Sequence, residues 1–121
     1  MIKVYYNEDG ICISDFKAES YVTSIIESYN ILIKNNLPHD IVINISNEVV
    51  LNYFVLKVYQ DILPIEEIEF YFNEEKLELH KYCGIENPQN PSNIFVNTDI
   101  VDKIIRLGYD KMRKDKGWPK I

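Results

Sequence analysis

The chain has 121 residues, of which 46% are hydrophobic and 26% are charged. This length favours a single globular domain over residues 1–121, and the composition excludes a wholly disordered or collagen-like chain. The formal net charge is −6, so we do not expect the body of the protein to bind nucleic acid directly.

The charge is distributed unevenly along the chain. Residues 103–121 carry seven basic and two acidic side chains, a net of +5, whereas residues 1–102 carry a net of −11. We interpret residues 112–121 as a basic C-terminal tail. This tail can meet the acidic part of the protein within one chain or across a homodimer, and the sequence leaves both arrangements open.

The first elements are predicted from short apolar runs. Residues 2–6 and 11–14 are rich in β-branched side chains, and the pair Asp9-Gly10 between them is typical of a hairpin turn. Apolar residues then recur with the spacing of one helix face, which predicts a helix over about 16–36.

The middle of the chain predicts a strand, a helix and another hairpin. Residues 41–45 are apolar enough for a central strand, and a helix over about 48–62 has so wide an apolar arc that we expect it to be heavily buried. Apolar and polar residues then alternate, which predicts strands over 68–72 and 77–80.

The last third predicts a long loop and a third helix. Residues 84–97 are rich in Asn and Pro, and a loop of this length is a candidate for a functional segment. Thr98 suits the cap of a helix whose acidic residues lie near its start and whose basic residues lie near its end. We expect the helix to end before Lys114.

The predicted order ββαβαββα favours the α/β class, with α+β as the alternative. Strands that are separated by a helix have to cross over, so we expect two parallel, right-handed units. The two hairpins add antiparallel pairs. The result is a small mixed sheet with the helices packed on it.

No pattern in the sequence points to a catalytic or metal centre. The phosphate-binding loops, the hydrolase elbow and the zinc-protease motif are all missing, so we expect no enzyme activity and no cofactor. His80 and Cys83 are the nearest pair of metal-ligand types, but residues three apart on a strand point to opposite faces. An enzyme that uses His80 or Cys83 is our third hypothesis.

The cellular location is inferred from the spacing of the two cysteines and from the search for a signal peptide or a membrane span. Cys12 and Cys83 are not in a CxxC pair, and we expect reduced thiols, although the sequence alone leaves a disulfide open. No signal peptide and no apolar run of about 20 residues are present, which predicts a cytoplasmic protein without a membrane span.

Acidic and tyrosine residues cluster on the predicted hairpin over 68–80. We expect this cluster to bind a protein partner with a basic surface, since complementary charge steers association. The leading hypothesis is therefore a non-catalytic interaction protein, such as an inhibitor, an immunity-type protein or an accessory subunit. The candidate partner-binding residues are Glu67, Glu69, Tyr71, Glu74, Glu75 and Glu78.

The alternative hypothesis is a module that binds a small molecule or nucleotide. Ligands of crossover units bind beyond the carboxyl ends of the strands, and basic residues with an aromatic side chain can hold a phosphate and a base. The candidates, together with the 84–97 loop, are Ser46, Asn47, Arg113, Lys114 and Trp118.

Two stretches, residues 43–51 (INISNEVVL) and 63–72 (LPIEEIEFYF), resemble a late segment of the ABC/RecF-like ATPases of bacterial defence loci. In that family a strand ends in a switch histidine and a Ser-Glu pair, and a helix and a strand follow. Here Ser46 occupies the position of the histidine, and the chain has no Walker A lysine motif. The resemblance implies a non-hydrolysing relative or companion protein in bacterial or phage defence.

Overall fold

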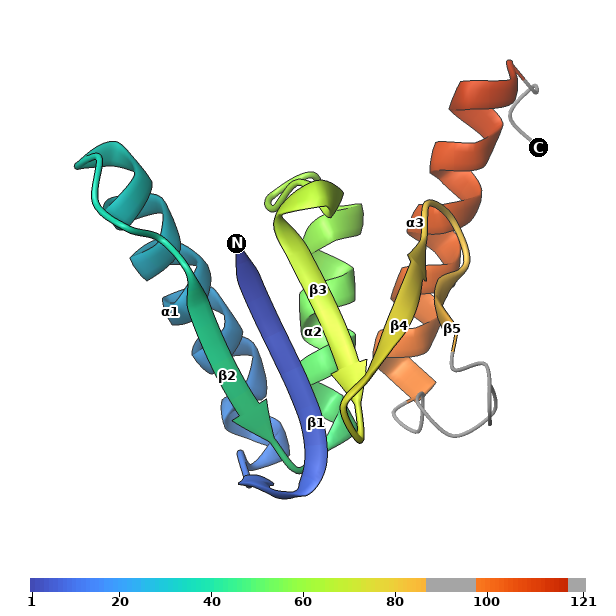
Figure 1. The fold of residues 1–121 in the computed structure, drawn as a ribbon. Coiled ribbons are helices and arrows are strands. Elements are labelled where there is room, and N and C mark those ends of the chain that lie inside the picture. Colours follow the sequence, from blue (N-terminus) through green and yellow to red (C-terminus); the bar gives the residue numbers. More distant parts are fainter. Residues whose placement is uncertain (87–97, 118–121) are drawn as a thin grey trace.

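The computed structural model describes residues 1–86 and 98–117, which form a mixed sheet with three helices on one face (Figure 1). The five strands lie in the order β2-β1-β3-β4-β5. This confirms the α/β class and the mixed sheet. The elements are β1 (Ile2–Ile11), α1 (Asp15–Lys34), β2 (Ile41–Ile45), α2 (Glu48–Tyr59), a 3₁₀ turn η1 (Ile65–Glu67), β3 (Ile68–Phe72), β4 (Glu75–His80), β5 (Gly84–Glu86) and α3 (Thr98–Lys116).

The predicted N-terminal hairpin is wrong, because residues 2–11 form one strand. β1 lies between β2 and β3 and is parallel to both, with Tyr6 paired to Ile45 and to Phe72. Beyond Tyr6 the strand bends, so that Ile11 also pairs with Ile45. Gly10 does not take the positive φ of a hairpin turn. It lies against the Ile45 backbone, where an added Cβ would be 2.3 Å from the carbonyl carbon, so its missing side chain permits this close approach.

The two strand–helix–strand units are parallel, as predicted, but they have opposite hands. β2 and β3 flank β1 on opposite sides. The connection through α1 therefore moves from β1 toward the β2 edge of the sheet, and the connection through α2 moves in the opposite direction, from β2 across β1 to β3. Both helices lie on the same face and pack against each other (Figure 1). One unit must therefore be left-handed, and it is β1-α1-β2, which corrects the expectation of two right-handed units. The bend of β1 carries the chain past the end of β2 before α1 begins.

Helix α2 forms the centre of the core, as its wide apolar arc predicted. It packs between α1 and α3, and nine of its twelve residues are buried. Phe54 contacts Phe70 of β3 edge to face, with ring centroids 6.4 Å apart. Asn52 is the exception in this apolar setting, because its side chain is fully buried and neither its Oδ1 nor its Nδ2 has a hydrogen-bond partner in the described part of the chain.

The C-terminal third differs from the prediction at both ends. Gly84–Glu86, expected to begin a loop, form the edge strand β5, and residues 87–97 lie outside the described residues. Helix α3 continues to Lys116, so the first half of the predicted basic tail over 112–121 is helical. Trp118 lies outside the described residues. Within residues 1–86 and 98–117, no helix is both long and apolar enough to cross a membrane.

Candidate functional site

The face of the sheet opposite the helices is open. Side chains alternate along each strand, so Ile2, Val4 and Phe70 are buried against the helices while their neighbours point the other way. None of the helices in the described part of the chain covers this second face (Figure 1). We define the open face by Lys3, Tyr5, Val42, Asn44, Glu69, Tyr71, Lys76 and Glu78.

Two stacked tyrosines lie at the centre of the open face. Tyr5 and Tyr71 are paired in the register of the adjacent strands β1 and β3. Their ring centroids are 4.5 Å apart and their planes differ by 9°, so the rings are stacked. Because both strands are central in the sheet, the backbone beneath the pair is held on both sides.

A hydrogen-bonded ion pair fixes the tyrosine stack. The Tyr71 hydroxyl donates to Glu69 Oε1 over 3.2 Å, and Lys76 Nζ lies 2.8 Å from Glu69 Oε2. The hydrogen bond from Lys76 lowers the pKa of Glu69, and Lys3 contributes to the same effect. The pKa of Tyr71 is raised, mainly by partial burial and to a smaller extent by its hydrogen bond to Glu69.

The open face combines balanced charge with aromatic surface. Two lysines and two glutamates leave it without net charge, and the tyrosines supply flat apolar surface with polar ends. A nucleophilic tyrosine needs a lowered pKa, whereas the pKa of Tyr71 is raised. The arrangement can stack against, and hydrogen-bond to, a partner.

The structure separates the six residues predicted to bind a partner. Glu69, Tyr71 and Glu78 lie on the open face, as described above. Glu67 instead accepts a hydrogen bond of 3.0 Å from the Tyr29 hydroxyl of α1, at the end of η1. Glu74 lies in the β3–β4 turn with a φ of 71°, and Glu75 pairs with Phe72 on the strand face toward the helices. The acidic cluster is therefore not one continuous surface.

Four of the alternative ligand-binding residues are described by the structure, and they lie at opposite ends of the sheet; Trp118 and residues 87–97 lie outside the described residues. Ser46 and Asn47 follow the end of β2, whereas Arg113 and Lys114 lie in the last turns of α3, at the other end of the sheet (Figure 1). The Asn47 side chain is already used, since its Nδ2 donates to the Ile13 carbonyl oxygen over 2.6 Å and its Oδ1 accepts from the Ile13 N–H over 3.3 Å. The structure thus does not bring these residues into one site.

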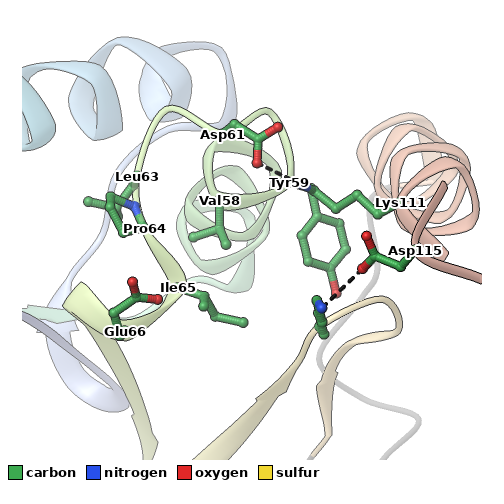
Figure 2. Close-up of a pocket in the computed structure, with 10 residues that line it drawn as sticks. Val58, Tyr59, Asp61, Leu63, Pro64, Ile65, Glu66, Lys111 and Asp115 are labelled. Carbon is green, nitrogen blue, oxygen red and sulfur yellow. Dashed lines mark hydrogen bonds and ion pairs between the residues drawn. The ribbon is translucent and has the colours of Figure 1, made fainter.

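A cavity of about 410 Å³ lies between the end of α2, η1, the β4–β5 turn and α3 (Figure 2). Lys111 Nζ lies 2.5 Å from Asp61 Oδ1, and Lys81 Nζ lies 3.0 Å from Asp115 Oδ2. Both lysines of the cavity are therefore matched by a carboxylate, and the pairs tie α3 to the rest of the domain. Sequence reasoning missed these residues, because they come from separate elements and only the fold brings them together.

Metal ligation finds no support in the arrangement of the described side chains. Residues 1–86 and 98–117 contain no group of three or more His, Cys, Asp or Glu side chains that could hold a metal ion. Cys12 and Cys83 are both exposed and are not joined in a disulfide. Within the described part of the fold, the pair His80 and Cys83 therefore belongs to no such group of three potential metal ligands.

No protein-family model, curated protein or solved structure matches this chain. The resemblance to ABC/RecF-like ATPases over about residues 41–72 therefore remains an expectation from the sequence.

Proposed function

We propose that this protein is a non-catalytic, cytoplasmic domain that binds a partner protein through its open face. The observation that carries the proposal is the Tyr5–Tyr71 stack, held by Glu69 and Lys76 on a sheet face that no described helix covers. Tyrosines of this kind are enriched in protein interfaces, where they provide large contact area at little entropic cost.

The charge of the protein favours a basic partner. The open face itself is neutral, but it belongs to a chain with a net charge of −6. At long range, such a field speeds the approach of a basic surface and slows that of nucleic acid. An inhibitor, immunity-type protein or accessory subunit of a basic enzyme would fit this charge, and free exposed cysteines suit a reducing compartment.

The test compares variants of the open face with one matched variant elsewhere. Proteins that the tagged chain retains from its producing cells are identified, and the affinity of the purified pair is then measured for Tyr5→Ala and Tyr71→Ala. Tyr109→Ala is the control, because Tyr109 is 40% exposed on α3. Loss of a central tyrosine should weaken binding by about 30-fold, which corresponds to about 2 kcal/mol, with the control within about threefold.

Two results would refute the proposal. One is a partner whose affinity is unchanged by both open-face variants. The other is binding of a single-stranded oligonucleotide that depends on Tyr5 and Tyr71, since stacked bases are the competing occupant of a tyrosine-bearing sheet face. Circular dichroism of each variant establishes that the fold is intact before binding is compared.

A further inference from the structure

The cavity beside the end of α2 lies where strands β3 and β4 separate. The two strands pair only over Phe70–Phe72 and Glu75–Leu77. If the register continued, Glu69 and Glu78 would lie directly opposite each other, and like charges in that position disfavour pairing. β4 instead turns away and pairs with β5, which leaves a wedge between β3 and β4 that widens toward η1 (Figure 1).

The cavity at the wide end of this wedge has the size of a small-molecule site. Its volume is about 410 Å³, and pockets of roughly 300–1,000 Å³ are typical for small ligands. Apolar side chains from the end of α2 and from the segment that leads into η1 form much of its lining: Val58, Leu63, Pro64 and Ile65 (Figure 2). Ile65 and Glu66 also line a second cavity of about 200 Å³ between β3 and β4. A ligand with an apolar body therefore finds both room and apolar contact.

The charges of the larger cavity leave one carboxylate unmatched. Lys111 Nζ is paired with Asp61 Oδ1 over 2.5 Å, and Lys81 Nζ is paired with Asp115 Oδ2 over 3.0 Å. Glu66 is the remaining charged residue of the lining, and its carboxylate takes part in no hydrogen bond or ion pair among the residues that the structure describes. A ligand that complements the cavity therefore carries one positive charge.

The end of helix α2 also favours a cation in this place. α2 ends at Tyr59, which lines the cavity, and the carbonyl end of a helix carries partial negative charge. An anion, in contrast, would have to displace a carboxylate from one of the lysines. Asp115 resists this exchange, because it is held by the Tyr82 hydroxyl as well as by Lys81. The lining thus favours an amine over a carboxylate or a phosphate.

We propose that this cavity binds a small organic cation, a primary amine carried on an apolar body. The ammonium group pairs with Glu66, and the apolar body lies against Val58 and Ile65. One wall of the cavity belongs to α3, through Lys111 and Asp115, and the other walls belong to the rest of the domain. An occupant contacts both parts and therefore holds α3 in place.

The experiment titrates the full chain with phenethylamine and follows binding by calorimetry and by two-dimensional NMR spectra. We expect a dissociation constant of about 1 mM or tighter, with the largest shifts at 63–66 and around Lys111. Two compounds of similar shape are the ligand controls: phenethyl alcohol, which is neutral, and phenylpropionate, which is an anion. Each should bind at least about tenfold more weakly, because neither supplies the positive charge that Glu66 lacks.

Glu66→Gln tests the contact with the amine, since it removes the charge of an exposed side chain and keeps its size. It should weaken the binding of phenethylamine by about tenfold or more and leave that of phenethyl alcohol unchanged. Glu27→Gln is the matched control and should stay within about twofold of the wild type. Glu27 is also exposed and also lines a groove, between α1 and α2, but not this cavity.

Hydrogen exchange gives a second readout, because the amides of Thr98–Lys116 should exchange more slowly when phenethylamine is bound. The inference is overturned by an absence of binding at about 10 mM, by tighter binding of phenylpropionate, or by binding that Glu66→Gln leaves unchanged. The cavity shares no lining residue with the set that defines the open face. A failure here therefore leaves the test of Tyr5 and Tyr71 unaffected.

Discussion

Tyr59 and Gly84 are joined by a hydrogen bond that ties the end of helix α2 to the edge strand β5. The Gly84 N–H donates to the Tyr59 hydroxyl oxygen over 2.6 Å, and the same hydroxyl donates to the His80 carbonyl oxygen over 2.7 Å. A single side chain from the core thus satisfies backbone groups at both ends of the β4–β5 turn. The turn and helix α3, which packs over it, depend on this bridge.

We expect Tyr59→Phe to lower the free energy of unfolding by about 1–3 kcal/mol, because the buried Gly84 N–H loses its partner while the ring is retained. Urea denaturation of the wild type and the variant measures the change. Tyr109→Phe removes a hydroxyl from a side chain that is 40% exposed and should change stability by less than about 0.5 kcal/mol. Equal losses in the two variants would contradict the bridging role.

Alkaline pH should unfold the protein by ionising three tyrosines, of which Tyr29 and Tyr59 are buried and Tyr6 is half-buried. Burial raises the pKa of Tyr6, Tyr29 and Tyr59 from 10.0 to about 12, and hydrogen bonds to Glu48 and Glu67 add to the effect at Tyr6 and Tyr29. Because these folded-state values lie above the unfolded value, the stability they contribute is fully present below pH 10.0 and is lost as the pH rises toward 12.

Phenolate absorbance, recorded together with the unfolding free energy over this pH range, tests that expectation. The native protein should show a late group of tyrosines that titrate with the loss of fold. Tyr59→Phe should remove one tyrosine from that late group. Titration of all nine tyrosines near pH 10.0 in a protein that is still folded would show that the three are not protected.

Gly108 permits helix α3 to lie directly on the turn after β4. An added Cβ at this position would be 1.9 Å from the Tyr82 carbonyl oxygen. Alanine in the middle of a helix is normally favoured over glycine by up to about 1 kcal/mol, but here the helix would have to move away from the turn. We therefore expect Gly108→Ala to destabilise the protein by about 1–3 kcal/mol.

Hydrogen exchange of the α3 amides, with denaturant unfolding, measures the effect of Gly108→Ala. The amides of Thr98–Lys116 should exchange faster in the variant than in the wild type. Arg106→Ala, at an exposed position of the same helix, is the control and should leave their exchange unchanged. A Gly108→Ala protein that is more stable than the wild type would show that the close approach to Tyr82 is not needed.

The ion pair on the open face should make stability sensitive to acid. The hydrogen bond from Lys76 lowers the pKa of Glu69, so this contribution to stability is present above the ordinary glutamate value of 4.5 and is lost as the pH falls through the folded-state value. The free energy of unfolding of the wild type should therefore converge with that of Glu69→Gln as the solution becomes acidic. A difference between the two proteins that stays constant into the acid range would mean that Glu69 acts through its shape and not its charge.

Local sequence patterns predicted most helices and strands of this fold. They did not predict how the strands are arranged where that arrangement depends on contacts between residues far apart in the sequence. Helices α1 and α2 and the strands over 41–45 and 68–72 follow from apolar spacing, which is a local property. The pair Asp9-Gly10 was misread as a turn, because the role of Gly10 is set by its contact with Ile45. The hand of the first crossover likewise depends on how the end of β1 passes β2.

The candidate site shows the same division. Alternation along 68–72 places Glu69 and Tyr71 on one face, which the sequence could predict. Tyr5 could not be added to them, because its pairing with Tyr71 requires β1 and β3 to be neighbours in space. Lys76 likewise becomes the partner of Glu69 only through the register of β3 and β4, so a surface that looked purely acidic in sequence is partly neutralised in the fold.

Asn52 is the strongest conflict between a side chain and its surroundings in the described structure. It lies on α2 with no exposed surface, and both polar atoms of its amide are without a hydrogen-bond partner among the described residues. Burial of an unpaired amide costs about 1–3 kcal/mol, and asparagine is also a weaker helix former than leucine. A natural protein that keeps such a residue tolerates a loss of stability that an apolar side chain of similar size would recover.

We therefore expect Asn52→Leu to raise the free energy of unfolding by about 1–3 kcal/mol, measured by urea denaturation at neutral pH. Asn30→Leu, at an exposed position of helix α1, is the matched control and should change stability by less than about 0.5 kcal/mol, since no buried polar group is removed there. If Asn52→Leu instead destabilises the protein, the unpaired state of the amide inferred from residues 1–86 and 98–117 is wrong. A higher free energy of unfolding in Asn52→Leu, with no increase in Asn30→Leu, would show that the buried amide of Asn52 lowers the stability of the wild type.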